Sequence, residues 1–366
     1  MLGLYKILHL SMAPISSDYQ AFSFQIIRCY IDNPRDLPWR NTRDPYKIWL
    51  SEIILQQTRV AQGLPYYEAF VSAYPTVEDL ALALEEDVLR LWQGLGYYSR
   101  ARNLHFCAKN IWFELGGKFP NTYESLLKLK GVGNYTAAAI SSFAFDEVKA
   151  VVDGNVFRVL ARYFGIPTDI ASGAGKKEFE ALANAIIPSD NPAEFNQAMM
   201  DFGARLCVPK SPDCESCPLK NTCFAYQQDL VGSLPVKINK TKVKERALHY
   251  MVIRCGNFSV WNKRTAGDIW EGLHDFPQEE TLTLGENEGK ILPLPESVEA
   301  YPKDFRHILS HQRLTAKFST ITISPDKSTE LAEWCNSQGL LMVEEERIDY
   351  LAKPKLIVNF LKDNEI

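Results

Sequence analysis

Four cysteines within 17 consecutive residues constrain this chain more than any other feature of its sequence. They are Cys207, Cys214, Cys217 and Cys223, spaced C-x6-C-x2-C-x5-C in the segment CVPKSPDCESCPLKNTC. Thiolates at such spacings hold either a structural zinc ion or an iron–sulfur cluster. A structural zinc site usually takes two tight pairs separated by a longer span, whereas here one compact loop carries all four ligands. The spacing therefore favours a [4Fe–4S] cluster, whose four protein ligands would leave no iron open to a substrate.

The 366-residue chain has no apolar run of the length needed to cross a membrane. We therefore expect a cytoplasmic, nucleoid-associated protein, in which the eight cysteines are reduced thiols or metal ligands. Residues 1–17 are mildly apolar but include Lys6 and His9. They are expected to form a disordered leader rather than a secretion signal.

The pattern of apolar residues changes near residue 247. Residues 18–228 predict one helix after another, with short Gly or Pro breaks such as Gly94–Gly96. Residues 247–366 instead predict shorter, strand-like runs and a final helix, KPKLIVNFLKD. Residues 229–246 form a Lys-rich linker between them. We expect a multidomain protein, with an all-α domain that contains the cysteine loop (207–223), followed by a smaller α+β domain.

The net charge of −5 argues weakly against a nucleic-acid partner. One basic run stands out, PVKINKTKVKER at 235–246, with Lys237, Lys240, Lys242, Lys244 and Arg246. This run is either a solvated linker or a direct DNA contact. Any binding of DNA must therefore rest on local basic patches and backbone donors rather than on a global field.

The segment KIWLSEIILQQTRV, residues 47–60, places a carboxylate among apolar side chains. It contains no Gly or Pro, and it predicts a helix of nearly four turns. Helical spacing puts Trp49, Glu52, Ile53 and Gln56 on one face. Glu52 is then either solvated at the edge of the apolar stripe or held in a dry pocket. The second alternative is expected only if the chemistry of the chain needs a buried acid.

The segment LKLKGVGNYTAAAISSF, residues 127–143, predicts two helices joined by a Gly-Val-Gly turn. Gly131 and Gly133 let the backbone turn tightly and leave peptide N–H groups at the start of a helix, which suits a DNA phosphate. The motif alone is weak, because many helix–turn–helix connections use glycine. Asp153 follows, and taken alone it could simply cap the next helix.

These segments, in this order, resemble the helix-hairpin-helix DNA glycosylases of the endonuclease III superfamily, and within it the MutY family of adenine DNA glycosylases. The resemblance spans nearly the whole chain and implies a helix-hairpin-helix at 123–144. It rests on RDLPWR (35–40), WLSEIILQQTRV (49–60), WQGLGYYSRARNLH (92–105), LKGVGNYTAAAI, DGNVFRVLARYF, FNQAMMDFGARLC, the cysteine run and FRHILSHQRL (305–314). It implies a monomer that removes adenine mispaired with 8-oxoguanine or guanine in double-stranded DNA by hydrolysis of the N-glycosidic bond.

The resemblance assigns the catalytic acid to Glu52 and the essential aspartate to Asp153, with Tyr135 and Asn155 beside them. A departing adenine must be protonated, so the acid must stay neutral near pH 7, as it would in an apolar pocket. Asp153 would supply the negative charge that stabilises the oxocarbenium ion. Tyr135 stands where strand-cutting relatives carry a lysine that forms a Schiff base. We therefore expect base removal without an efficient lyase step.

The DNA contacts are implied by the same resemblance. The residues expected to distort the duplex are Gln56, Gln57 and Tyr97. The residues expected to line the adenine pocket are Arg35, Leu37 and Trp39. Trp39 could equally be a plain core aromatic, and that alternative remains open.

Residues 247–366 resemble the C-terminal domain of the MutY family, which is related in fold to Nudix hydrolases. The metal-binding helix of those hydrolases is missing from QEETLTLGENEG, which follows IWEGLHDFP. A magnesium-dependent pyrophosphatase is therefore not expected. The domain should instead recognise the lesion through Ser310 and His311 in LSHQ, although this chain has Leu309 where the family has an aromatic residue.

Two other functions fit part of the pattern. A thymine or uracil mismatch glycosylase would share Asp153 and the cluster but would need no C-terminal reader of this kind. A non-catalytic iron–sulfur redox sensor would bind DNA, and Glu52 and Asp153 would be dispensable for it.

Overall fold

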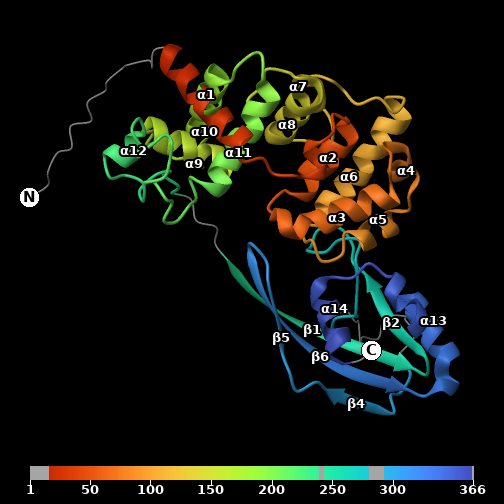
Figure 1. The fold of residues 1–366 in the computed structure, drawn as a ribbon. Coiled ribbons are helices and arrows are strands. Elements are labelled where there is room, and N and C mark those ends of the chain that lie inside the picture. The colour runs from red at the N-terminus through yellow and green to blue at the C-terminus, as the bar shows by residue number, and fades with distance from the viewer. Residues whose placement is uncertain (1–15, 239–242, 280–291, 365–366) are drawn as a thin grey trace, which may run out of the picture. The chain divides into compact units, whose positions relative to one another are not determined.

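The computed structural model describes residues 16–238, 243–279 and 292–364 (Figure 1). The chain divides into two compact units, each made from two stretches of sequence. Unit 1 comprises residues 1–52 and 119–239, and unit 2 comprises residues 53–118 and 240–366. The predicted leader up to residue 15, Lys240 and Lys242 of the basic run, and most of QEETLTLGENEG lie outside the described residues. The predicted change from helices to strands is confirmed.

Unit 1 is helical. Its elements are α1 (Ser16–Asp32), η1 (Pro38–Arg40), α2 (Pro45–Ile54, which runs two residues past the unit boundary), α7 (Tyr123–Leu126), α8 (Asn134–Phe145), α9 (Gly154–Phe164), α10 (Gly173–Ile186), α11 (Pro192–Arg205) and α12 (Phe224–Gln227). The apolar faces of α1, α9, α10 and α11 meet in one core, which includes Phe22, Val159, Phe179 and Phe202. Val156, in the first turn of α9, belongs to this core, and Cys207, Cys217 and Cys223 of the cysteine loop pack against it.

The predicted helix over 47–60 is correct only in its first part. Helix α2 ends at Ile54, and Gln57 takes a left-handed φ of 54°. The guanidinium of Arg100 explains the end of the helix. Its Nη1 donates to the carbonyls of Ile53, Ile54 and Gln56, at 2.8, 2.9 and 2.7 Å. Those carbonyls therefore have partners without a further helical turn. Because the helix ends before Gln56, the prediction that Gln56 shares a helical face with Glu52 is wrong.

Unit 2 combines a second set of helices with the sheet. The helices of its first stretch are α3 (Val60–Ala73), α4 (Val77–Leu82), α5 (Glu85–Leu91), α6 (Ser99–Lys109) and the π-helix η2 (Asn110–Glu114). Side chains of these helices contact the second stretch directly. Arg102 pairs with Glu271 at 2.8 Å and Lys263 with Glu86 at 2.6 Å. Such contacts explain why residues 53–118 belong with the sheet.

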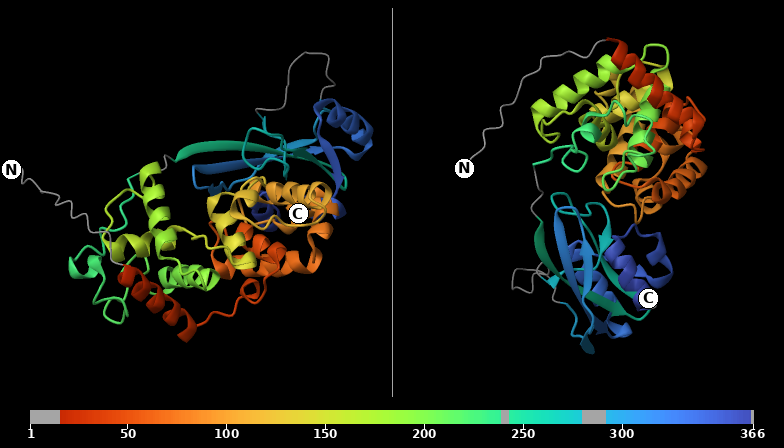
Figure 2. Two further views of the ribbon diagram at one scale, coloured as in Figure 1. Left: turned by 90° about the horizontal axis from the view of Figure 1, so that it is seen from above. Right: turned by 60° about the vertical axis from the view of Figure 1, so that its left-hand side comes forward.

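The sheet is mixed, and its two longest strands are parallel. Its strands are β1 (Lys244–Cys255), β2 (Phe258–Lys263), β3 (His274–Asp275), β4 (Ser297–Ala300), β5 (Phe305–Ile308), β6 (Gln312–Ile323) and β7 (Leu341–Glu344). Their order is β3-β2-β1-β6-β4, with β5 also on β6 and β7 also on β2. Strands β1 and β6 pair in parallel from Lys244↔Gln312 to Cys255↔Ile323 (Figure 2).

Alternating residues of the long strands serve two cores. Leu248, Tyr250 and Val252 of β1 pack in one core with α14 (Lys355–Asp363). Ile253 and Cys255 pack in the other with α13 (Ser328–Gln338). This alternation follows from the two-residue period of a strand, and it places one helix on each face of the sheet. Two short helices, η4 (Pro325–Lys327) and η5 (Glu345–Tyr350), are the remaining helical elements of the described part of this stretch.

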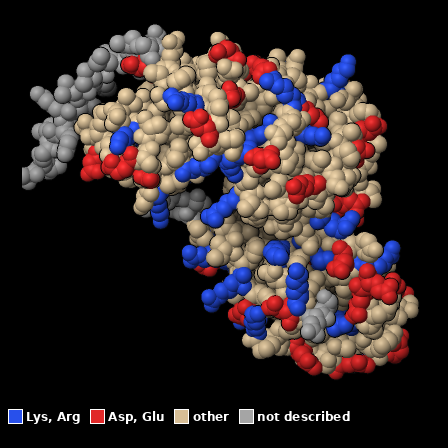
Figure 3. Space-filling model, in the orientation of Figure 1, with Lys and Arg blue, Asp and Glu red and all other residues tan. Residues whose placement is uncertain are grey.

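Charges of both signs share the molecular surface. In the view of Figure 3, Lys and Arg side chains are interspersed with Asp and Glu side chains. This agrees with the small net charge of −5. Within residues 16–238, 243–279 and 292–364, no helix is both long and apolar enough to cross a membrane.

Candidate active site

Glu52 lies on α2 and is 7% exposed. Burial raises the pKa of its carboxyl to about 7, and the nearby carboxylate of Asp153 raises it further, while a hydrogen bond from Tyr135 and the charge of Arg40 oppose the shift. Of the two alternatives that the sequence left open, the structure has the dry pocket. A carboxyl with this pKa holds its proton in a substantial fraction of molecules at neutral pH, which is what a general acid requires.

Tyr135 stands in the first turn of α8 and joins Glu52 to the hairpin. Its hydroxyl hydrogen-bonds the Glu52 carboxylate and also lies 3.5 Å from the sulfur of Met200. Burial and the two neighbouring carboxylates raise the pKa of the phenol well above its usual value. Tyr135 is therefore a neutral donor at this site and cannot act as an amine nucleophile.

Asp153 is the N-cap of α9, which was one of the roles that the sequence allowed, and its carboxylate lies close enough to Glu52 to affect the pKa of that carboxyl. Its Oδ1 accepts from the backbone N–H groups of Asn155 at 2.9 Å and Val156 at 2.8 Å. Its Oδ2 accepts from Nδ2 of Asn155 at 2.8 Å. Burial raises the pKa of Asp153, and these hydrogen bonds oppose the rise. Capping and catalysis are compatible here, because the hydrogen bonds that cap the helix also fix the carboxylate.

Arg158, one turn along α9, connects the carboxylate to the cysteine loop. Its guanidinium donates to Oδ1 of Asn155 at 2.9 Å and to the carbonyl of Cys207 at 2.7 Å. It also donates to the carbonyl of Gly203 at 2.7 Å. A Cβ on Gly203 would lie 2.7 Å from Cβ of Asn155, so only glycine lets α11 approach this closely. The position of Asn155 thus depends on Arg158 of α9, on Gly203 of α11, and, through Arg158, on Cys207 of the cysteine loop.

The four predicted metal ligands come together in unit 1. Cys207, Cys214, Cys217 and Cys223 line one small cavity with Arg162 and apolar side chains. Arg162 lies 3.4 Å from the sulfur of Cys207 and donates to the carbonyl of Val208 at 2.8 Å. No three His, Cys, Asp or Glu side chains of the described residues are arranged to hold a metal ion. The four thiols nevertheless face a common space beside a cation, which fits an anionic group larger than one ion.

The predicted adenine-pocket residues lie just before α2. Leu37 and Trp39 are 6% and 8% exposed, so both are buried, and the two interpretations of Trp39 stay open. Arg35 donates to Asp201 at 3.2 Å. Arg40 makes a bidentate pair with the same carboxylate at 2.7 and 2.8 Å. Asp201 therefore orients both arginines, and of the two it is Arg40 whose charge acts on Glu52.

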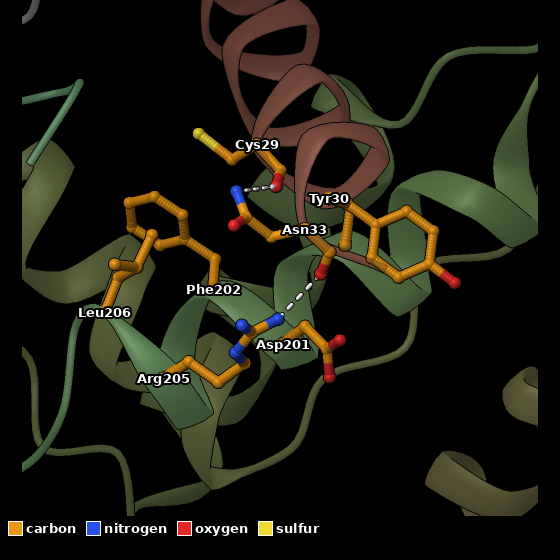
Figure 4. Close-up of a pocket in the computed structure, with 8 residues that line it drawn as sticks. Cys29, Tyr30, Asn33, Asp201, Phe202, Arg205 and Leu206 are labelled. Atoms are coloured by element: carbon orange, nitrogen blue, oxygen red, sulfur yellow. Dashed lines mark hydrogen bonds between the residues drawn. The ribbon is translucent and has the colours of Figure 1, made fainter. Parts of the chain in front are cut away.

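Figure 4 shows Asp201 on α11 beside Tyr30 of α1. The two helices line a cavity of about 100 Å³ at this point. Arg205 donates across it to the carbonyl of Asn33 at 2.7 Å. Contacts between α1 and α11 thus fix the helix that carries Asp201.

The three predicted wedge residues lie in unit 2 on two turns that share one support. Gln57 and Tyr97 both have left-handed backbones, with φ of 54° and 47°, and both side chains are exposed. Besides the carbonyl of Gln56, Arg100 binds the carbonyl of Gly96 at 3.2 Å, and its guanidinium lies 5.7 Å from the ring of Tyr97. A non-glycine residue at positive φ persists only where its surroundings hold it. Here one buried guanidinium holds both turns.

The hairpin has the predicted turn and the predicted second helix, α8, but its first helix, α7, ends at Leu126, before the segment 127–143 begins. Gly131 has a φ of 82°, which favours glycine, while the intervening Val132 is buried. Gly133 is the N-cap of α8 with an extended backbone, and no side chain caps the helix there. The exposed start of α8 thus presents backbone donors, as the anion-site prediction requires.

The predicted lesion readers lie in a tight turn between β5 and β6. Ser310 and His311 are exposed, and Oγ of Ser310 lies 3.3 Å from Nδ1 of His311. Leu309 donates its N–H to the carbonyl of Gln312 at 2.8 Å, and the carbonyl of His311 accepts from Lys244 at 3.0 Å. The backbone of this turn is therefore fixed, while the two side chains face solvent.

Four arginine and aspartate residues were missed by the sequence analysis: Arg40, Arg100, Arg158 and Asp201. All of them lie inside the motifs quoted for the resemblance. Each acts through backbone carbonyls or another charged side chain that is distant in sequence. The only signal available was an ionisable residue within an otherwise apolar helical stretch, and this signal does not identify a partner.

Comparison with known proteins agrees with this geometry. Residues 50–188 match the family model of the HhH-GPD superfamily base excision DNA repair protein, and residues 249–363 match that of the NUDIX domain. The chain is 32% identical to a solved thermostable thymine-DNA glycosylase, with a TM-score of 0.53, over 58% of this chain and 98% of that one. It shares the fold of endonuclease III trapped on DNA, at 23% identity and a TM-score of 0.52, over 59% and 99%. The helical part is thus a base excision repair glycosylase fold, and the predicted fold class is confirmed.

The relatives narrow this class further. The adenine DNA glycosylase of Buchnera aphidicola (subspecies Schizaphis graminum) is 36% identical over 296 residues, which cover 79% of this chain and 85% of the relative. The mouse adenine DNA glycosylase is 43% identical over 242 residues, 64% of this chain and 47% of that longer protein. This chain belongs to the adenine DNA glycosylase family.

Proposed function

We propose that this protein removes adenine mispaired with 8-oxoguanine or guanine in double-stranded DNA by hydrolysing the N-glycosidic bond. The observation that carries the proposal is Glu52, a buried acid whose pKa is raised to about 7, next to the carboxylate of Asp153, which caps α9. Membership of the adenine DNA glycosylase family supports adenine as the base. The 8-oxoguanine partner is supported by the presence of a sheet domain with an exposed Ser310–His311 turn.

In the proposed reaction, the adenine leaves the duplex stack and enters the site beside Glu52. The neutral carboxyl of Glu52 gives its proton to a ring nitrogen of the base, which makes the base a better leaving group. Tyr135 then stabilises the new carboxylate through the hydrogen bond that it already makes. Asp153 carries the negative charge that stabilises the oxocarbenium ion at the sugar, and water completes the hydrolysis.

Tyr135 supports base removal without strand cleavage, because a phenol forms no Schiff base with the sugar. The change Tyr135→Lys should produce a complex with abasic DNA that borohydride traps, whereas the parent protein should give little. Strong trapping by the parent would show that another amine reacts, and the monofunctional proposal would fail.

We propose that Cys207, Cys214, Cys217 and Cys223 hold a [4Fe–4S] cluster. The shared cavity and the adjacent Arg162 support this assignment. When bound, a cluster with four protein thiolates supplies a structural cross-link of the loop and no open iron. The purified protein should be brown, with absorbance near ~400 nm and nearly equal iron and sulfide. Zinc in samples prepared with and without air would contradict the assignment.

Binding of DNA is proposed to use Gln56, Gln57 and Tyr97 as wedges and Gly131 and Gly133 as the phosphate site, with one monomer per lesion. The exposed side chains of Gln57 and Tyr97 at positive φ and the uncapped start of α8 support these roles. They suit a protein of net charge −5, since backbone donors bind phosphate without a basic surface.

The deciding experiment incubates the protein with duplexes that contain A, T or U opposite G or 8-oxoguanine, followed by heat and alkali. Cleavage at A, strongest opposite 8-oxoguanine, is the expected result. Cleavage at T or U would favour a mismatch glycosylase of the kind that the 32% identical structure represents. Binding of DNA with no cleavage of any duplex would favour the non-catalytic sensor.

A further inference from the structure

The proposed catalytic acid, Glu52, lies within the influence of a fixed cation. Burial and the carboxylate of Asp153 favour the proton on Glu52, whereas a hydrogen bond from Tyr135 and the charge of Arg40 oppose it. Arg40 stands in η1, and its guanidinium remains charged at any pH of interest. A nearby positive charge favours the carboxylate over the neutral carboxyl. Arg40 therefore acts against the protonation that a general acid needs.

Asp201 of α11 is the carboxylate that offsets Arg40. Its two oxygens accept from Nη1 and Nη2 of Arg40 at 2.8 and 2.7 Å, and the two side chains are 9% and 6% exposed, in the order Arg40 and Asp201. Burial raises the pKa of Asp201, but its bonds to Arg40 and Arg35 outweigh that effect and hold the pKa below its usual value. Asp201 is thus ionised at neutral pH. A close pair of opposite charges exerts a much weaker field than the cation alone.

Tyr30 of α1 holds the same guanidinium from a second side. The guanidinium of Arg40 lies 5.5 Å from the centre of the Tyr30 ring, and the hydroxyl of Tyr30 donates to Oε1 of Gln197 at 2.7 Å. Burial raises the pKa of Tyr30, so its phenol is neutral and supplies no counter-charge. Asp201 lies one turn beyond Gln197 on α11 and lines a small cavity with Tyr30 (Figure 4). The direction of the Arg40 side chain is therefore fixed by α1 and α11 together.

The other charged groups around this site do not take over the role of Asp201. Asp153, at the start of α9, adds negative charge at Glu52 but makes its hydrogen bonds to Asn155 and the backbone of α9. Arg35 shares Oδ1 of Asp201 at 3.2 Å, but its side chain is 29% exposed, so solvent screens its charge more strongly. Asp201 acts on Glu52 through Arg40.

We propose that Asp201 is a positioning residue for the acid: it keeps the Arg40 cation paired and directed toward α11, so that Glu52 holds its proton when the adenine arrives. The inference rests on the proposed function and deepens it, because it explains how a carboxyl beside a buried arginine can act as an acid. A purely structural role, in which Asp201 only joins η1 to α11, predicts a loss of activity at every pH. The electrostatic role predicts a loss that depends on pH.

The test measures the single-turnover rate of adenine release by the full-length protein from about pH 5 to pH 9, on a duplex with adenine opposite 8-oxoguanine. Asp201→Asn keeps the shape of the side chain but leaves Arg40 unpaired, so Glu52 should lose its proton at lower pH. The midpoint of the alkaline limb should move down by about one pH unit, with a rate about tenfold lower above it and a parent-like rate at the acid end. Asp146→Asn, the matched control, removes the carboxylate of an exposed pair with Arg43 in the same unit and should leave the profile unchanged.

A second variant, Arg40→Gln, keeps the inference testable if Asp201→Asn does not fold. Removal of the cation should move the midpoint above that of the parent, and the double variant, which leaves no unpaired charge, should bring it at least back to the parent's value. The inference is overturned by a midpoint at or above the parent's in Asp201→Asn, or by one at or below it in Arg40→Gln. If the parent releases no adenine at any pH, or if Glu52→Gln keeps the parent's rate, the proposed function fails instead, so the two failures are distinguishable.

Discussion

The candidate chemistry and the candidate reading of DNA lie in different units of the molecule and are built differently. In unit 1, Glu52 is almost fully buried, and Asp153 is fixed by two backbone N–H groups and Asn155. In unit 2, the side chains of Gln57, Tyr97 and the Ser310–His311 turn are exposed. Hydrogen bonds from Arg100 fix the first two turns, and backbone hydrogen bonds fix the third. The proposed chemistry depends on burial, whereas the proposed reading depends on fixed turns that present exposed side chains.

This difference determines what a substitution should change. A group whose function depends on a shifted pKa loses that function even when its replacement has nearly the same shape. An exposed group on a fixed turn contributes only the contacts that it makes with DNA. Substitutions in unit 1 should therefore affect the rate of bond cleavage directly. Those in unit 2 should affect the choice and distortion of the duplex, and should change the rate only through that distortion.

The largest effect is expected for Glu52→Gln. Glutamine has nearly the same shape but no acidic proton, so the single-turnover rate of adenine release should fall by about 10²- to 10⁴-fold. The affinity for the duplex should stay near that of the parent. A near-normal rate in this variant, measured with saturating enzyme, would show that Glu52 is not the acid.

The rate of adenine release should also depend on pH as a catalytic acid at Glu52 requires. The folded pKa of Glu52 is raised to about 7 from 4.5, so the active protonated form is lost as pH rises through 7. The rate should fall about tenfold per pH unit above that point. The folded state also binds this proton more tightly than the unfolded state, so stability should decline as pH rises from 4.5 to 7. Glu52→Gln should therefore gain thermal stability relative to the parent at pH 8 but not at pH 4, and an equal difference at both values would contradict the assignment.

Asp153→Asn should lower the rate by about 10²- to 10³-fold, as for the loss of one stabilising electrostatic group. Asparagine caps a helix as well as aspartate does, so α9 should remain intact. Circular dichroism and thermal unfolding provide the control for folding. A variant with intact α9 and the parent's rate would show that capping is the only role of Asp153.

Arg100→Lys should have an intermediate effect, and it tests the support of the wedges. In Arg100, Nη1 binds the carbonyl of Gln56 and Nη2 binds that of Gly96, whereas lysine has a single donor nitrogen and cannot reach both carbonyls in the same geometry. The rate on a saturated mispair should fall roughly tenfold, equivalent to about 1.4 kcal/mol. 2-Aminopurine in place of the adenine should report less extrusion through a weaker fluorescence rise. The exposed variant Arg90→Lys is the control, and a parent-like fluorescence rise in Arg100→Lys would exclude the proposed support.

The sequence predicted what local patterns determine. The change from helices to strands, the Gly-Val-Gly turn and the cap at Asp153 depend on residues close in sequence, and all three are present. The end of α2 at Ile54 was missed because it depends on Arg100, 46 residues away. Likewise, no pattern of spacing relates Arg158 to Cys207, which lies 49 residues further along the chain. The roles of exposed side chains such as Ser310 rest on the resemblance, because their burial and contacts impose no constraint.

The smallest effect is expected for the double change Ser310→Ala and His311→Ala. 8-Oxoguanine carries a hydrogen on N7 where guanine has an acceptor, so Oγ of Ser310 can accept from the lesion alone. One such contact provides about 1–3 kcal/mol of discrimination. Because both side chains are exposed and the turn is held by its backbone, folding should be unaffected. In a competition assay the preference for adenine opposite 8-oxoguanine over adenine opposite guanine should fall, while the maximal rate on 8-oxoguanine substrate falls much less.

Tyr350→Ala, at an exposed position of the same unit, is the matched control. If the double variant keeps the parent's preference, the reading resides elsewhere in unit 2, and the division between a catalytic and a reading unit must rest on the wedge residues alone.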